Sequence, residues 1–174
     1  MAEPASRDRL QPSLLDRLTD NQPRDGRETA EARVLTRQQL RAAVLRDLSW
    51  LFNTTRPEPE AASSRKSEID LWRPYENARR SVLNFGMPAF AGVTKSRLNR
   101  PAMEASIKQA ITTFEPRIDA KSLTVSILID PQHHHNMLQL TIRGLMWAQP
   151  LPLELMFAAD LELETGDTRM RDLH

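Results

Sequence analysis

The feature that most constrains the fold is an alternation of apolar and polar residues in the last third of the chain. It recurs three times, at residues 122–129, 138–143 and 153–164. Successive side chains of a strand point to opposite faces of a sheet, so each stretch predicts a strand with one apolar and one polar face. We therefore expect a three-stranded antiparallel sheet that is covered on one side only.

Two stretches with helical spacing can supply that cover. The first runs over about residues 34–52 and opens with Thr36 and Gln39, the pattern of a capping box. The second runs over about residues 99–114, with Asn99 as its cap. Their apolar stripes are Leu40, Val44, Leu48, Leu51 and Phe52 in the first, and Met103, Ile107, Ile111 and Phe114 in the second. The predicted class is α+β, with two main helices packed on one face of the sheet.

The 174 residues favour a single domain with extensions. Residues 1–33 are rich in charge and proline and bury too little apolar surface to order alone, so we expect a mobile N-terminal arm. Residues 34–167 then form one domain, and residues 168–174 form a C-terminal tail that adds at most a stub of strand. Within the domain, residues 53–73 are predicted to be a flexible insertion or a segment that only a partner orders.

One island in the arm, residues 13–18, has helical character. Ser13 can cap a short helix in which Leu14, Leu15 and Leu18 share one face. Two interpretations are open. The helix can fold back on its own domain, or it can dock its leucines in the groove of a partner.

The third predicted strand carries acidic residues on its polar face, among them Glu154, Asp160 and Glu162. We expect this long, late strand to lie at an edge of the sheet. Charge on an edge strand prevents indiscriminate pairing, but it permits pairing with a strand of opposite charge. The sequence leaves open whether this edge is merely solvated or binds a partner strand.

The composition excludes several classes of protein. There are 24 Lys and Arg residues against 23 Asp and Glu residues, which argues against a basic protein that coats nucleic acid. The absence of cysteine excludes disulfides, thiolate catalysis and Cys-ligated metal sites. No apolar run is long enough for a membrane helix, and the start of the chain does not resemble a secretory signal. We expect a cytoplasmic protein.

The side chains that usually carry out catalysis are poorly placed. His133, His134 and His135 are consecutive, so at most two of them share a side, and a metal site there needs a further ligand such as Asp130. A polar hairpin loop explains these histidines better. Gly-rich phosphate loops and the Gly-x-Ser-x-Gly elbow are both missing from the sequence. We therefore predict no catalytic residue, no cofactor and no metal.

A carboxylate pair is the remaining enzymatic option. Glu104 and Glu115 lie eleven residues apart on the same predicted helix, which separates them by roughly 16 Å. That distance is too long for a pair of glycosidase carboxylates.

The tripeptide Glu115-Pro116-Arg117 ends the second helix. Pro116 prevents the helix from continuing, so a carboxylate and a guanidinium flank a rigid corner before the first strand. The two charges can pair with each other or with opposite charges elsewhere. They can also be the solvated charges of an ordinary helix end.

Four segments together resemble a known family. They are Ser13–Leu18, Val44–Thr54, Ser81–Pro88 and Phe114–Ile118, and the resemblance spans about residues 12–167. In this order and spacing they are similar to TssE, a baseplate subunit of the bacterial type VI secretion system. That family is in turn similar to the small wedge protein of contractile phage tail baseplates.

The resemblance implies a structural role in assembly. TssE-like proteins belong to wedges with TssF and TssG, near TssK and the VgrG spike, and they help to start the TssB–TssC sheath. The baseplate docks at the inner face of the cytoplasmic membrane. The Glu115-Pro116-Arg117 corner and the third strand then become candidate partner-binding sites, together with Leu14, Leu15 and Leu18.

Two other functions remain as alternatives. The first is a peptidoglycan-cleaving, lysozyme-like hydrolase, an activity with which some relatives have been labelled. The second is a generic regulatory binding module.

Overall fold

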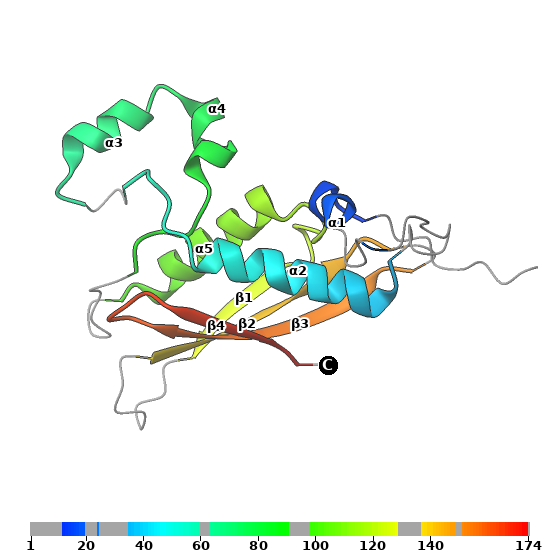
Figure 1. The fold of residues 1–174 in the computed structure, drawn as a ribbon. Coiled ribbons are helices and arrows are strands. Elements are labelled where there is room, and N and C mark those ends of the chain that lie inside the picture. Colours follow the sequence, from blue (N-terminus) through cyan, green and yellow to red (C-terminus); the bar gives the residue numbers. More distant parts are fainter. Residues whose placement is uncertain are drawn as a thin grey trace, which may run out of the picture.

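The computed structural model describes residues 12–19, 24, 35–59, 63–90, 98–128, 137–148 and 151–173. Four antiparallel strands form one sheet in the order β1 (Thr124–Leu128), β2 (Met137–Met146), β3 (Leu153–Glu162) and β4 (Thr168–Asp172). In the register, Ile127, Leu140, Ala159 and Met170 form one row across the sheet. The sheet twists beneath a layer of helices (Figure 1).

Two helices cover the apolar face, as the sequence predicts. Helix α2 (Arg37–Phe52) begins with the predicted Thr36–Gln39 capping box, and α5 (Arg100–Phe114) begins with the Asn99 cap. Both lie across the same side of the sheet (Figure 1). Their stripes pack on the alternate strand residues, and Val44, Ile107 and Phe157 are fully buried. A fully buried apolar side chain contributes about 1.5–3 kcal/mol, so this interface between helices and sheet holds the domain together.

The sheet has four strands, and the prediction of three is wrong. Gly166, with φ of +85°, turns the chain back after β3, and residues 168–172 pair along β3 instead of forming a tail. The fourth strand is short and carries three charged residues among five. Thr168 is buried and Met170 is half-buried. This strand therefore lacks the clear alternation of apolar and polar residues by which a strand is recognised in a sequence.

The prediction that the third strand lies at an edge is also wrong. β3 is paired with β2 along its whole length and with β4 over residues 157–161. The edges of the sheet are β1 and β4.

The predicted linker contains helical structure. Residues 63–85 form an excursion with α3 (Lys66–Trp72), α4 (Glu76–Arg79) and the 3-10 turn η1 (Val82–Asn84). The excursion projects away from the sheet and its helices (Figure 1).

The base of the excursion is tightly joined to the domain. The Met87 N–H donates to the Thr54 carbonyl at 2.7 Å, and the Arg56 N–H donates to the Met87 carbonyl at 2.9 Å. Gly86 has φ of +128°, and a Cβ atom there would lie 2.5 Å from the Thr54 carbonyl oxygen. Only glycine fits such a position without strain. The Ser81–Pro88 segment is therefore a structural joint.

Candidate functional site

The chain turns sharply where α5 meets the sheet. Glu115 ends α5, and Pro116 has no N–H with which to continue it. Beyond the turn, the Trp147 N–H donates to the Arg117 carbonyl at 2.9 Å, which attaches the corner to the chain just after β2. Backbone hydrogen bonds therefore fix the direction of Glu115-Pro116-Arg117.

Glu115 and Arg117 form a bidentate pair at this corner. The Glu115 side chain is only 4% exposed. Nε of Arg117 donates to Oε1 at 2.6 Å, a second guanidinium nitrogen donates to Oε2, and the Arg117 backbone N–H donates to Oε1 at 3.2 Å. This geometry confirms that the two charges pair. A buried carboxylate with this fork of donors is satisfied within the chain, so the corner is stiff.

The pair extends to helix α2. A guanidinium nitrogen of Arg117 donates to Oδ2 of Asp47 at 2.5 Å, and Nε of Arg46 donates to Oδ1 of Asp47 at 2.8 Å. Burial lowers the pKa of Arg117, but the hydrogen bonds and charges of Glu115 and Asp47 outweigh burial and hold that pKa above its ordinary value. Arg117 therefore remains charged and ties the corner to the helix layer.

The same network reaches the N-terminal helix α1 (Leu14–Leu18). Arg46 forms an ion pair with Asp16 at 2.9 Å. The other carboxylate oxygen of Asp16 accepts hydrogen bonds from the Ser13 N–H at 3.1 Å and the Ser13 hydroxyl at 2.6 Å. Burial raises the pKa of Asp16, but the Ser13 and Arg46 contacts together bring it below its ordinary value of 3.8. These contacts form one row of linked ion pairs that runs through Glu115, Arg117, Asp47, Arg46 and Asp16. We call this row the charge relay, a structural term that implies no transfer of a proton.

Helix α1 is attached by its polar side, and its leucines face outward. Leu14 and Leu18 are 74% and 73% exposed, and Leu15 is also exposed. Trp50 on α2 is exposed as well, and the Arg46 guanidinium lies 5.3 Å from the centre of its ring. The interpretation that residues 13–18 fold back on their own domain is therefore confirmed, whereas docking of the leucines in a partner groove stays a prediction. The helix contacts its own domain, and its apolar face remains available.

The acidic residues of β3 lie on the uncovered face of the sheet, apart from the charge relay. Asp160 forms an ion pair with Arg171 of β4 at 2.5 Å, and Glu162 accepts a hydrogen bond from the Thr165 hydroxyl at 3.1 Å. The Glu154 side chain is exposed. Because β3 is interior, these residues do not mark a free strand edge.

Helix α2 binds both ends of the true edge strand, β4. The Asn53 side chain donates to the Thr168 carbonyl and accepts from the Thr168 N–H, each at 2.9 Å. Arg41 binds both carboxylate oxygens of Asp172, at 2.9 and 2.6 Å. Between them, the backbone of Met170 points outward and has no hydrogen-bond partner among the described residues.

The opposite edge, β1, is partly occupied. The Glu104 carboxylate accepts a hydrogen bond from the Ile127 N–H at 2.8 Å and pairs with Arg100 at 3.0 Å. The backbone hydrogen bond, followed by the contact with Arg100, lowers the pKa of Glu104. Glu104 is therefore a structural carboxylate that blocks this edge.

Sequence reasoning missed the partners that complete the site, namely Asp16, Arg46 and Asp47. A signal for Asp47 was present, because it lies one helical turn before the buried Leu51, beside the apolar stripe. A charged residue at that position of a helix usually needs a partner. The sequence does not show that the partner lies 70 positions away.

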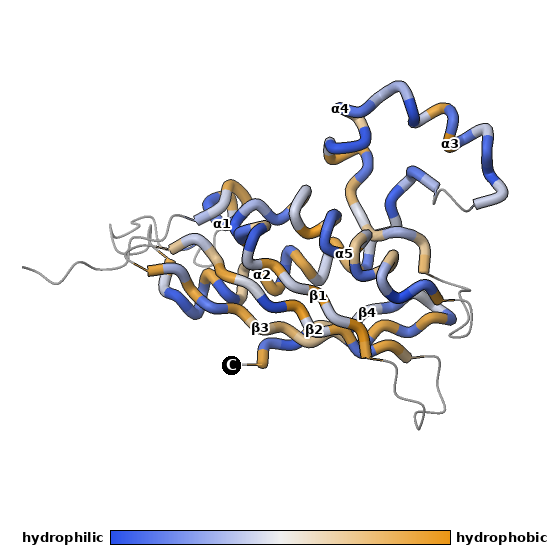
Figure 2. Tube along the Cα trace, turned by 180° about the vertical axis from the view of Figure 1, so that it is seen from behind, coloured by the Kyte–Doolittle hydropathy of each residue, from blue (hydrophilic) through white to orange (hydrophobic). Residues whose placement is uncertain are grey.

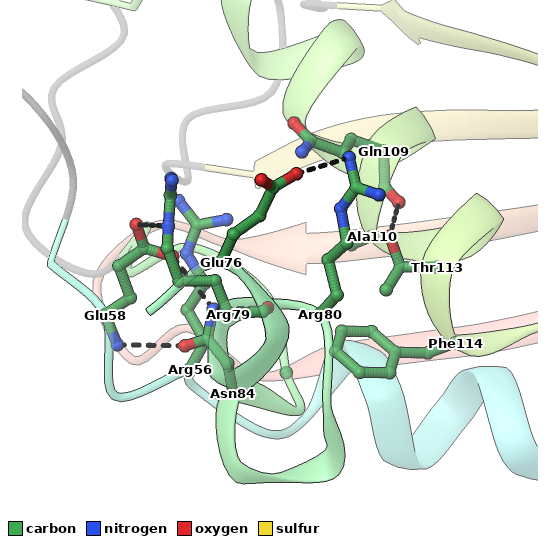
Figure 3. Close-up of a pocket in the computed structure, with 11 residues that line it drawn as sticks. Arg56, Glu58, Glu76, Arg79, Arg80, Asn84, Gln109, Ala110, Thr113 and Phe114 are labelled. Atoms are coloured by element: carbon green, nitrogen blue, oxygen red, sulfur yellow. Dashed lines mark hydrogen bonds and ion pairs between the residues drawn. The ribbon is translucent and has the colours of Figure 1, made fainter. Parts of the chain in front are cut away.

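A shallow polar pocket of about 180 Å³ lies between the excursion and α5 (Figure 3). The carboxylate of Glu58 in it is held by Arg79 at 2.7 Å and by the Asn84 amide at 2.9 Å. Glu76 pairs with Arg80 at 3.1 Å. These charges stabilise the base of the excursion.

Two further expectations from the sequence concern the histidine segment and membrane-spanning helices. The residues His133, His134 and His135, with Asp130, lie outside the described residues. No helix in the described part of the chain is long and apolar enough to cross a membrane.

The comparisons with known proteins identify the family. A search of the curated proteins and a search of the solved structures gave no match. The family model described as "Baseplate wedge protein gp25" matches residues 38–151, a range that includes all but the first residue of α2, together with α5, the Glu115-Pro116-Arg117 corner and β2. The match covers well over half of the chain and confirms the resemblance to wedge proteins drawn from the sequence. The chain belongs to the gp25 family of baseplate wedge proteins, which are structural components of contractile tail machines.

Proposed function

We propose that the protein is the TssE-like subunit of a type VI secretion baseplate, and that it joins the wedge to the contractile sheath and helps to start sheath polymerisation. The observation that carries the proposal is the stiff Glu115-Pro116-Arg117 corner inside the region matched by the family model. A corner that internal ion pairs hold rigid keeps the surfaces around it in a fixed geometry. A template for sheath assembly requires such a fixed geometry.

In this proposal, α1 makes the contact with the wedge subunits. Its exposed leucine face suits an apolar groove on TssF or TssG, and the charge relay holds that face in a fixed orientation relative to the corner. TssK and the VgrG spike are further neighbours in this assembly at the inner face of the cytoplasmic membrane.

In this proposal, β4 makes the contact with the sheath. Strand addition needs outward backbone N–H and C=O groups, and β3 has none to offer over the stretch that β4 covers. Met170 offers such groups at the β4 edge, whereas Glu104 occupies the corresponding N–H of Ile127 on β1. A TssB or TssC strand that pairs with Met170 would extend the sheet by one strand, and pairing further along β4 would require it to displace Asn53 from Thr168.

The proposed role is not enzymatic. Glu115 is buried in its pair with Arg117, and Glu104 is held by Ile127 and Arg100. Neither carboxylate is placed to act as a general acid. A peptidoglycan zymogram of the purified protein should show no clearing.

The edge can be tested with Met170→Pro in cells that carry a fluorescent sheath protein. Proline removes the outward N–H of residue 170 without removing a bond to β3, and edge strands accept proline at such positions. Met170→Ala is the matched control, because it removes the side chain and keeps the N–H. We expect sheath foci with Met170→Ala and at least about tenfold fewer with Met170→Pro. Equal numbers of foci in the two variants would contradict the sheath contact.

The wedge contact is tested separately by co-purification with TssF and TssG. Leu14→Ser with Leu18→Ser should lower recovery of the complex, and Leu128→Ser, at an exposed leucine on the uncovered sheet face, is the control. Unchanged recovery of the complex with the double variant would remove α1 from the proposal.

A further inference from the structure

The excursion formed by residues 63–85 has little internal support. Neither α3 nor α4 contains a buried residue. The two helices contact each other, α4 contacts η1, and the whole segment stands away from the sheet (Figure 1). The excursion therefore has almost no hydrophobic core of its own. We call residues 63–85 the arm, as distinct from the predicted N-terminal arm of residues 1–33.

Helices of this length do not stabilise themselves. α3 has seven residues and α4 has four, and isolated helices shorter than about 12–15 residues are marginal in water. α3 and α4 also lack a side-chain N-cap hydrogen bond. Such helices normally depend on an apolar face packed against something else.

The excursion carries apolar side chains that nothing in the described chain covers. Val82 and Leu83 are 81% and 67% exposed, and Leu71 and Tyr75 are also exposed. Figure 2 shows short hydrophobic stretches within the mostly hydrophilic α3–α4 segment. Single exposed leucines are ordinary, but four large apolar side chains on one projecting arm indicate an interaction site.

The base of the arm holds it in position. Asn84 is buried, accepts from the Glu58 N–H at 3.1 Å and donates to the Arg79 carbonyl at 3.1 Å. Together with the Gly86 joint, these contacts fix where the arm leaves the domain. A partner therefore meets an arm whose root is ordered in advance, which reduces the entropic cost of binding.

The charge of the arm points to the chemistry of that partner. Residues 63–85 hold five basic and three acidic side chains, so the segment is positive although the whole chain is close to neutral. Arg73 and Arg80 are highly exposed, and among the described residues they form ion pairs with exposed acids of their own helical segment. Exposed pairs of this kind exchange partners at little cost.

We propose that residues 63–85 form a docking arm that inserts Leu71, Tyr75, Val82 and Leu83 into an apolar groove with an acidic rim on another protein. The contact is distinct from the proposed α1 and β4 contacts and stands whether or not those are correct. Docking would supply the covering surface that α3 and α4 lack.

Site-specific photocrosslinking in the native host tests the proposal with the full chain. A photoreactive phenylalanine at position 82 should give an adduct with one protein, and mass spectrometry should locate the adduct in an apolar segment flanked by acidic residues. Adding Arg73→Glu and Arg80→Glu should reduce that adduct about tenfold. The probe at Ala105, an exposed position on α5, is the control for random collision.

Two further measurements make the result decisive. The charge-reversed variant should unfold at the same temperature as the parent, because both arginines are exposed. The parent protein should also fail to sediment with vesicles of phosphatidylglycerol and phosphatidylethanolamine. Adducts only with lipid or with a second copy of the chain, adducts insensitive to charge reversal, or no adduct above the Ala105 control would each overturn the docking arm.

Discussion

At the scale of single residues, the most consequential contact is the fork between Arg117 and Glu115. Arg117→Ala leaves the buried Glu115 carboxylate without its main partner, and removing one member of a buried pair is strongly destabilising. Because Arg117 is 22% exposed, we expect a loss of about 2–3 kcal/mol in the free energy of unfolding, measured by urea denaturation.

Arg171→Ala is the matched control for that loss. Arg171 also pairs with a carboxylate, that of Asp160, but its side chain is 56% exposed. This variant should lose less than about 1 kcal/mol. If the two variants lost the same free energy, the view that burial makes the corner stiff would be wrong.

At the scale of elements, the joint at Gly86 sets where the excursion leaves the domain. Gly86→Ala places a methyl group 2.5 Å from the Thr54 carbonyl oxygen at a φ that alanine avoids. We expect a loss of about 2–4 kcal/mol in the free energy of unfolding. Gly144→Ala is the control, because its Cβ atom would meet a side-chain methyl of Ile118 at 3.2 Å, and it should lose about 1 kcal/mol.

Elements were predictable from sequence where pattern and caps agreed. α2 and α5 combine helical spacing with Thr36 and Asn99 caps, so α5 was placed almost to the residue, and α2 ends at Phe52 as predicted but begins at Arg37 instead of residue 34. β4 was missed because its five residues bury little, and the pairing that defines it depends on β3. The edge assigned to β3 failed for the same reason, since a missed neighbour turns an interior strand into an apparent edge.

At the scale of the whole molecule, the charge relay joins the N-terminal helix to the corner through α2. The leucine face of α1 and the Glu115-Pro116-Arg117 corner were visible in the sequence as separate motifs. Their connection was not, because Asp47 and Arg117 meet only after the sheet has brought α2 and α5 together. Sequence reasoning therefore found the leucine helix and the proline corner, and it missed the ion pairs of Arg46 and Asp47 that connect them.

The relay predicts how acid affects α1. The folded protein lowers the pKa of Asp16 below 3.8, so the stabilisation that Asp16 provides is complete above pH 3.8 and is lost as the pH falls through the lowered value. We expect the amide protons of α1 to lose their protection from exchange below that pH, while those of α5 keep it. Asp16→Asn should release α1 already at neutral pH, and unchanged protection of α1 in that variant would contradict the relay.

The attachment of α2 to β4 has a practical consequence for imaging. Asp172 is bound by Arg41, and the Leu173 N–H donates to the Met156 carbonyl at 3.0 Å, so residue 173 lies beside the outermost strand. A fluorescent reporter joined directly after residue 173 would crowd that strand and mimic a defective mutant. A long, glycine-rich spacer before the reporter is the construction that keeps the tagged protein informative.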